Sequence, residues 1–289
     1  MVRELNTQLA DPFLLMMDIE GPSIRTGEIS SPKPYKQGEK FRLVADIKNA
    51  QWTDITCDYP ELINDVKIGG TVRIESGLFD TTVCEKWPDY IVLEAQNDFE
   101  LTSKRHINLP GVHVNQPTIT DTDKEHMQFA VQAGFSYVAI SFCRNAADIA
   151  EARTILENNK WSQIKLIAKI ENQEGIDNLD AIVDASNIVM VARGDLGTEL
   201  PLETIPEVQM HIVKTCKLKN TPVIVATQMM SSMVDHPAPT RAEVSDVFLA
   251  VREGADYLML SEETTVGHYP IQVVEMMKKI IDEAQDFDK

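Results

Sequence analysis

Charged side chains follow two apolar runs in the middle of the sequence. Lys169 and Glu171 lie two residues apart, so on a β-strand both project from the same face. Asp195 follows the next apolar run, and two carboxylates from neighbouring strands make a hard-oxygen site suited to Mg²⁺ or Mn²⁺. A lysine beside such a metal stabilises negative charge on an enolate or on a phosphoryl group in transfer. From spacing alone, a plain Lys169–Glu171 ion pair at a barrel rim explains the pattern equally well.

Three other segments carry groups that suit anion binding or proton transfer. Backbone N–H groups of Arg193-Gly-Asp-Leu-Gly197 precede a predicted helix and suit an anion, but an ordinary glycine-containing turn is the simpler interpretation. Arg25 is a candidate phosphate ligand because guanidinium groups bind phosphate bidentately, although most arginines are solvated surface groups. The hydroxyl of Thr227 suits either a proton relay or a helix cap, and capping is the simpler interpretation.

Apolar runs that alternate with amphipathic helical stretches predict an α/β fold. The runs are almost continuous in Val, Ile, Leu and Met, which indicates a parallel sheet covered by helices. In such folds ligand groups gather where strands end and helices begin. The architecture is either a (β/α) barrel or an open sheet, and six units stand against the eight that a closed barrel needs. The predicted strands are Phe13–Ile19, Ser136–Phe142, Ile164–Ile170, Ile188–Ala192, Pro222–Thr227 and Tyr257–Ser261.

Two further local patterns punctuate the chain. Between about 33 and 108, short β-branched and aromatic runs are broken by turn residues and show no helical period, which predicts a small β domain. After it, Thr122-Asp-Lys-Glu125 has the spacing of a helix capping box, and Gly134 sits where the C-terminal cap belongs. The predicted division is therefore 1–32, 33–108 and 109–289, with the β domain inserted into the α/β unit.

Composition excludes several classes of protein. The 289 residues carry 27 Lys and Arg against 45 Asp and Glu, a net charge of −18, which argues against nucleic acid as a partner. No apolar stretch is long enough to span a membrane, and the N-terminus does not have the pattern of a secretory signal. The four cysteines are widely spaced, which suits reduced thiols in a cytoplasmic protein.

Taken together, the polar segments closely resemble the pyruvate kinase family. They occur in the family's order and cover almost the whole chain. The matching motifs are Asp18-x-x-Gly-Pro-x-Ile-Arg-Thr-Gly27, Asn108-Leu-Pro-Gly111, Leu166-Ile-Ala-Lys-Ile-Glu-Asn-Gln-Glu-Gly-Ile-Asp-Asn-Leu179, Val191-Ala-Arg-Gly-Asp-Leu-Gly197, Val225-Ala-Thr-Gln-Met229, Pro239-Thr-Arg-Ala-Glu-Val-Ser-Asp246 and Met259-Leu-Ser-x-Glu-Thr264.

The resemblance implies a TIM-barrel domain with a β-rich lid domain inserted after the third strand. It implies phosphoryl transfer from phosphoenolpyruvate to ADP, giving pyruvate and ATP in glycolysis, with Mg²⁺ (or Mn²⁺) and usually K⁺. By motif, Glu171 and Asp195 would hold Mg²⁺, and Lys169 would stabilise the enolate and the phosphoryl group. The remaining roles that the resemblance implies are substrate binding by backbone at Ala192, Gly194 and Asp195, substrate binding and enolate protonation by Thr227, and nucleotide binding by Arg25 and Arg105.

Several positions depart from the family pattern. Asp18 would be a K⁺ ligand, but Ile19 replaces a threonine of the K⁺ site, so that site is expected to be incomplete. Glu20 stands where the family has a lysine, His106 replaces a hinge glycine, and Glu262 replaces another glycine. The segments that resemble the first two barrel strands and the C-terminal domain are not found, so a truncated homologue is expected.

Three functions follow from the match and the departures. The first is pyruvate kinase activity with the Mg²⁺–enolpyruvate centre retained. The second is metal-dependent enolate chemistry on pyruvate or oxaloacetate without a nucleotide, since this needs only the metal and its surroundings. The third is a catalytically inert binding or assembly subunit. Six barrel units leave exposed sheet edges, so we expect a homo-oligomer or a complementary fragment to cover them.

Overall fold

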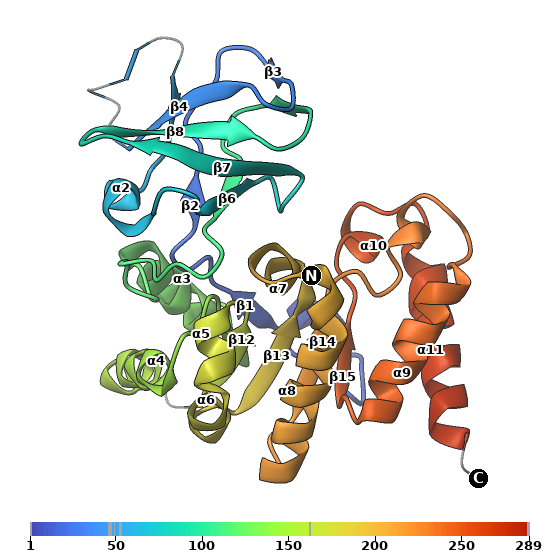
Figure 1. Ribbon diagram of the computed structural model, residues 1–289. Coiled ribbons are helices and arrows are strands. Elements are labelled where there is room, and N and C mark those ends of the chain that lie inside the picture. The colour runs from blue at the N-terminus through green and yellow to red at the C-terminus, as the bar shows by residue number, and fades with distance from the viewer. Residues whose placement is uncertain (1, 46–47, 49, 52–53, 162, 288–289) are drawn as a thin grey trace.

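The computed structural model describes residues 2–45, 48, 50–51, 54–161 and 163–287. Its backbone forms two bodies (Figure 1): an α/β body built on a parallel sheet, and a β body that stands over one end of that sheet. Each body has its own cluster of buried apolar side chains. The division of the chain at 32/33 and 108/109 stays a prediction.

Six parallel strands form the sheet of the α/β body, in the order β1-β11-β12-β13-β14-β15. The sheet curls, but β1 and β15 do not pair with each other, so the architecture is the predicted incomplete TIM barrel. Each predicted apolar run contains one of these strands. Their bounds are β1 Met16–Asp18, β11 Tyr137–Ile140, β12 Lys165–Ile170, β13 Ile188–Ala192, β14 Val223–Ala226 and β15 Tyr257–Met259.

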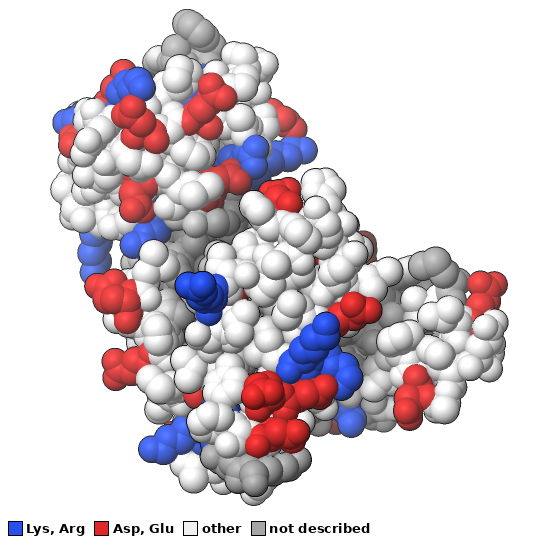
Figure 2. Space-filling view, turned by 90° about the vertical axis from the view of Figure 1, so that its right-hand side faces the viewer, with Lys and Arg blue, Asp and Glu red and all other residues white. Residues whose placement is uncertain are grey.

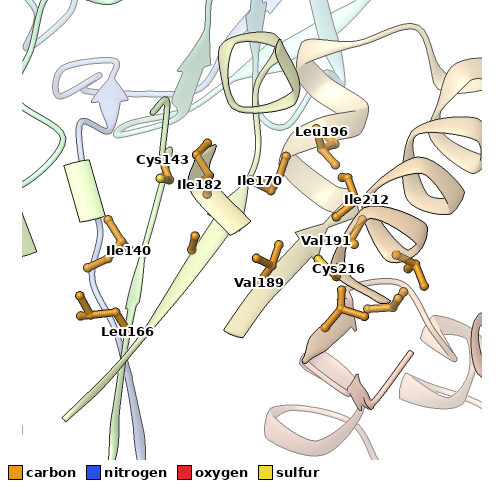
Figure 3. Close-up of a cluster of buried hydrophobic side chains, with 14 of the residues drawn as sticks. Ile140, Cys143, Leu166, Ile170, Ile182, Val189, Val191, Leu196, Ile212 and Cys216 are labelled. Carbon is orange, nitrogen blue, oxygen red and sulfur yellow. The ribbon is translucent and has the colours of Figure 1, made fainter. Parts of the chain in front are cut away.

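Helices cover the outer face of this sheet (Figure 1). Leu156, Ile182 and Ile212, from three different helices, are buried against the strands in one continuous core, part of which Figure 3 shows. The helices are α1 Val2–Asn6, α3 Asp121–Gln132, α4 Ala146–Asn158, α5 Gln173–Asp177, α6 Leu179–Ala185, α7 Arg193–Glu199, α8 Ile205–Lys219, α9 Arg241–Glu253, α10 Glu262–Thr265 and α11 Pro270–Asp286, with 3₁₀ turns at Leu202–Thr204 and Ser231–Val234.

The inner, concave face of the sheet has a separate apolar layer. Ile167, Met190 and Ile224, from three neighbouring strands, are buried together there. Since side chains alternate along a strand, Lys169 projects from the same face as Ile167, one step nearer the C-terminal end of β12. The sheet therefore delivers its C-terminal polar residues to the inside of the half-barrel.

The β body is a small barrel. Its strand order is β2-β10-β6-β7-β8-β4-β5, and the two edge strands meet through a bridge between Thr26 and Cys57. Phe79 fills the interior and stacks on Phe99 with ring centroids 5.0 Å apart. The bounds are β2 Ile24–Arg25, β4 Lys40–Val44, β5 Ile55–Thr56, α2 Leu62–Asp65, β6 Thr71–Ile74, β7 Phe79–Lys86, β8 Tyr90–Ala95 and β10 His106–Asn108, with a flanking pair β3 Lys33–Tyr35 and β9 Phe99–Leu101.

Helix α3 begins earlier than its sequence pattern predicts. Its N-cap is Thr120, whose hydroxyl accepts from the N–H of Asp123, while the Asp123 carboxylate accepts from the N–H of Thr120 at 2.8 Å. The predicted capping box at Thr122–Glu125 is therefore wrong. Asp123 is fully buried and also accepts from two N–H groups after β1, so contacts remote in sequence select this register. Gly134 follows the C-cap with φ 73°, as predicted.

Candidate active site

The ammonium group of Lys169 is held by oxygen atoms from neighbouring strands. It donates to Ser141 Oγ at 2.8 Å and lies 3.0 Å from both Asp18 Oδ1 and Glu171 Oε1. Burial alone would lower the pKa of Lys169, but the carboxylates of Glu171 and Asp18 outweigh burial and raise it above its ordinary value. Lys169 is therefore a fixed positive charge at the C-terminal end of β12.

Glu171 is fully buried beside that charge. Its Oε2 accepts a hydrogen bond of 2.6 Å from the N–H of Phe142. Its Oε1 lies 3.0 Å from the Lys169 ammonium but accepts no well-aligned hydrogen bond. Burial raises the pKa of Glu171, Lys169 opposes that rise, and the charge of Asp195 adds to it. A buried carboxylate oxygen with spare acceptor capacity suits a cation ligand.

Asp195 stands in the first turn of α7, directly after β13. Its carboxylate makes no hydrogen bond or ion pair to any residue that the structure describes. Together, Asp195 and Glu171 offer two hard-oxygen donors, which fits Mg²⁺ because this ion keeps several water or substrate ligands. No three His, Cys, Asp or Glu side chains in the described ranges are grouped to hold a metal by themselves.

Thr227 and Gly194 are brought together across β13 and β14. The Thr227 hydroxyl accepts from the N–H of Gly194 at 2.7 Å, so this backbone donor is already engaged. Thr227 has φ 69°, and Arg193 secures the turn by donating to the Thr227 carbonyl at 2.7 Å. Ala192, the last residue of β13, is buried. Arg193 was not predicted as a site residue, and its only signal was its place in the glycine-containing turn.

The two predicted nucleotide-binding arginines lie in different surroundings. Arg25 faces the inner side of the half-barrel from β2, and Glu20 accepts from its guanidinium group. Arg105 instead pairs with Glu75 at 2.8 Å inside the β body. Arg105 does not line the cavity that contains Lys169.

An open cavity of about 430 Å³ brings Lys169, Glu171, Asp195 and Arg25 together, but Ala192, Gly194 and Thr227 are not among its lining residues. His106 enters the cavity from the β body. Its ring lies edge-on to that of Phe142, with the two ring centroids 5.9 Å apart, and burial lowers the pKa of His106. The lining residues are Asp18, Ile19, Glu20, Ser23, Arg25, His106, His126, Ser141, Phe142, Lys169, Glu171 and Asp195.

Ser141 and Phe142 belong to this cavity although their residue types do not mark them. Their only signal in the sequence was that they end the predicted strand Ser136–Phe142. In the structure β11 stops at Ile140, and Phe142 takes φ 52°, which turns its N–H onto Glu171.

Glu199 couples the α/β body to the β body beside this cavity, accepting from the Asn108 amide at 3.0 Å. Burial raises the pKa of Glu199 to about 7. Between pH 4.5 and 7 the folded state therefore holds a proton that the unfolded chain has released, and the free energy of unfolding falls as the pH rises through this range.

The Glu199→Gln variant should not show this loss of stability at high pH. Its advantage over the native chain in free energy of unfolding is expected to be ~2 kcal/mol larger at pH 8 than at pH 5. Urea titrations at both pH values measure this difference. The exposed Glu203→Gln variant should show none, and equal behaviour of the two would refute the assignment.

Comparisons with known proteins identify the family of the chain. Residues 1–274 match a family model described as "Pyruvate kinase, barrel domain". The chain belongs to the pyruvate kinase family. The incomplete (β/α) barrel described above is thus part of a pyruvate kinase barrel domain.

Individual relatives show how much of a pyruvate kinase the chain spans. It is 39% identical to a pyruvate kinase of Borreliella burgdorferi over 96% of this chain and 57% of that protein. It is 40% identical to one of Geobacillus stearothermophilus over 96% of this chain and 48% of that protein. The crystal structure of a pyruvate kinase from Cryptosporidium parvum matches with a TM-score of 0.89 and 38% identity, over 93% of this chain and 57% of that chain. The chain therefore spans about half the length of these relatives.

The K⁺ ion used in this family does not fit the residues around Asp18. Both carboxylate oxygens of Asp18 lie within 3.2 Å of the Lys169 ammonium. Ile19, where an oxygen ligand is needed, is apolar and 1% exposed. The ammonium group thus already balances the charge of Asp18.

Proposed function

We propose that this chain carries out the pyruvate kinase reaction, transferring the phosphoryl group of phosphoenolpyruvate to ADP and giving pyruvate and ATP. The observation that carries the proposal is the arrangement at the end of β12: a largely buried ammonium group on Lys169 beside the carboxylates of Glu171 and Asp195, of which Glu171 Oε1 accepts no well-aligned hydrogen bond. Such a pairing of a fixed positive charge with a hard-oxygen site suits a reaction in which charge moves between an enolate and a phosphoryl group.

Each site residue then has a defined task. Glu171 and Asp195 would hold Mg²⁺, which when bound neutralises charge on the phosphoryl and enolate oxygens. Lys169 would stabilise the negative charge on the enolate and on the phosphoryl group during transfer. Thr227 would orient the substrate and help protonate the enolate. If the Gly194 N–H no longer donated to the Thr227 hydroxyl, it could donate to the substrate carboxylate instead. Arg25 would bind the nucleotide phosphates.

The test is pyruvate formation by the purified chain from phosphoenolpyruvate, ADP and Mg²⁺, followed by proton NMR. We expect turnover, and less than about a twofold change when Na⁺ replaces K⁺, because the Lys169 ammonium stands in for the monovalent ion. Absence of turnover from chain shown to be folded by circular dichroism would refute the proposal. A tenfold dependence on K⁺ would refute the role given to the ammonium group.

A second candidate function is enolate chemistry on pyruvate or oxaloacetate without a nucleotide. It is favoured by the pairing of Arg25 with Glu20, which removes a free cation from the nucleotide side of the cavity. Deuterium exchange into the methyl group of pyruvate measures this chemistry directly. Metal-dependent exchange in a chain that makes no pyruvate from phosphoenolpyruvate would favour the second function over the first.

The two edge strands of the parallel sheet indicate a partner that covers them. Among the described strands, β1 and β15 pair on one side only. Exposed apolar side chains lie in β15 and in α11, including Tyr257 in the strand and Ile271 and Val274 in the helix. We propose that a second copy or a complementary chain segment covers these edges in the cytoplasm. A monodisperse monomer in light scattering would contradict this. No helix in the described part of the chain is long and apolar enough to cross a membrane.

A further inference from the structure

The carboxylate of Glu20 forms an ion pair with the guanidinium group of Arg25. Its Oε1 accepts from Arg25 Nη2 at 2.9 Å and from Nε at 3.1 Å. The remaining nitrogen of the guanidinium group, Nη1, donates to the Lys104 carbonyl at 3.4 Å. In this arrangement none of the three guanidinium nitrogens is left without a partner inside the protein.

The backbone holds Glu20 in place for this contact. The N–H groups of Glu20 and Gly21 both donate to Asp123 Oδ1, at 3.1 and 3.3 Å, and Asp123 is fully buried. Arg25 is fixed in turn because β2 pairs with β10, placing Arg25 opposite His106. The pair thus joins a loop of the α/β body to a strand of the β body, and both residues line the cavity.

The charges in the cavity make this contact important for an anionic ligand. Lys169 is already shared by Asp18 and Glu171, and Asp195 adds an unpaired carboxylate. With Glu20 on Arg25, an incoming diphosphate group meets no lysine or arginine in the cavity lining that is free of a carboxylate partner. On the face that Figure 2 shows, basic side chains lie in small groups among acidic ones and form no continuous basic band.

We propose that Glu20 lowers the affinity of the site for nucleotide by competing with the nucleotide phosphates for Arg25. This inference rests on the proposed function, because that function assigns Arg25 to the nucleotide. The Glu20 and Arg25 side chains are 52% and 42% exposed, so the ion pair is weak and exchangeable. Glu20 therefore lowers nucleotide affinity without abolishing binding, and phosphoenolpyruvate, which binds at Lys169, is affected less.

The direct test measures dissociation constants for ADP and for phosphoenolpyruvate by calorimetry, with Mg²⁺ present. Glu20→Gln is expected to tighten ADP binding by about two- to fivefold, the range for releasing an exposed ion pair. Glu20→Lys, which adds a cation, should tighten it by about tenfold. The ratio of the two ligand affinities should shift toward ADP in both variants. Glu28→Gln, which removes an exposed carboxylate paired with Lys104 away from the cavity lining, is the matched control.

A double-mutant cycle separates competition for Arg25 from a general charge effect. In an Arg25→Met chain, Glu20→Gln should no longer tighten ADP binding. Equal tightening with and without Arg25, or equal shifts for ADP and phosphoenolpyruvate, would overturn the proposal. So would failure of both the native chain and Glu20→Lys to bind ADP.

These readouts do not depend on turnover. A chain that makes no pyruvate, yet binds ADP more tightly after Glu20→Gln only when Arg25 is present, would refute the proposed reaction and support the role of Glu20. A chain that makes pyruvate but shows no coupling between the two residues would do the reverse.

Discussion

Lys169→Met is expected to lower kcat for pyruvate formation by about 10²- to 10³-fold. The ammonium group is the positive charge nearest to Glu171 and Asp18, and its side chain is only 12% exposed, so little water screens it. Methionine keeps most of the side-chain volume, which limits the change to the charge and its hydrogen bonds. Coupled assays at saturating Mg²⁺, phosphoenolpyruvate and ADP measure kcat.

The matched control is Lys165→Met on the same strand. Lys165 projects from the same face of β12 as Lys169, but at the opposite end of the sheet and exposed, with its ammonium 6.0 Å from the Tyr137 ring centroid. Its removal should change kcat by less than about twofold. Thermal unfolding of both variants shows whether a lost rate reflects lost folded protein. If kcat survives Lys169→Met in folded protein, the assignment of Lys169 is wrong.

The strands could be predicted from the sequence because their signal is local. Residues 188–192 are all apolar and all buried, and β13 has the predicted bounds. The run at 136–142 was predicted to end two residues too late, because Phe142 leaves the extended conformation with φ 52°. That turn serves a hydrogen bond to Glu171, 29 residues further along the chain, which no local pattern contains.

The site was predictable in part, for the same physical reason. Strand parity placed Lys169 and Glu171 on one face, and the parallel sheet brought Asp18 and Asp195 to the same edge. The partners that adjust these groups come from far away in sequence. Asp123 holds the loop at Glu20 across 103 residues, and Arg105 turns to Glu75 instead of the cavity. Residue type cannot predict such choices, since they depend on which neighbours the fold supplies.

Arg193→Met is expected to lower the free energy of unfolding by about 2–4 kcal/mol. The guanidinium group is 10% exposed and donates to the Thr227 carbonyl at 2.7 Å, to Asp246 at 2.8 Å and to Gln209 at 3.3 Å. Without it, the Thr227 carbonyl and the Asp246 carboxylate lose these donors. Urea titration followed by circular dichroism measures the change. Arg153→Met is the control, because Arg153 donates to the Ala185 carbonyl at 3.1 Å without an ion pair in the described residues, and it should cost under about 1 kcal/mol.

Arg193→Met should also lower kcat. Arg193 does not touch the substrate in the proposed site, but it positions Thr227, which does. Thr227 and Gln228 both have positive φ, of 69° and 52°, which is unfavourable for residues other than glycine and asparagine and persists only where neighbours enforce it. Combining Arg193→Met with Asp246→Asn should recover part of the stability, because the unpaired charge is gone, but not kcat, because the Thr227 turn is still unsupported. Recovery of both would mean that Arg193 acts through stability alone, and the turn at Thr227 would need no external support.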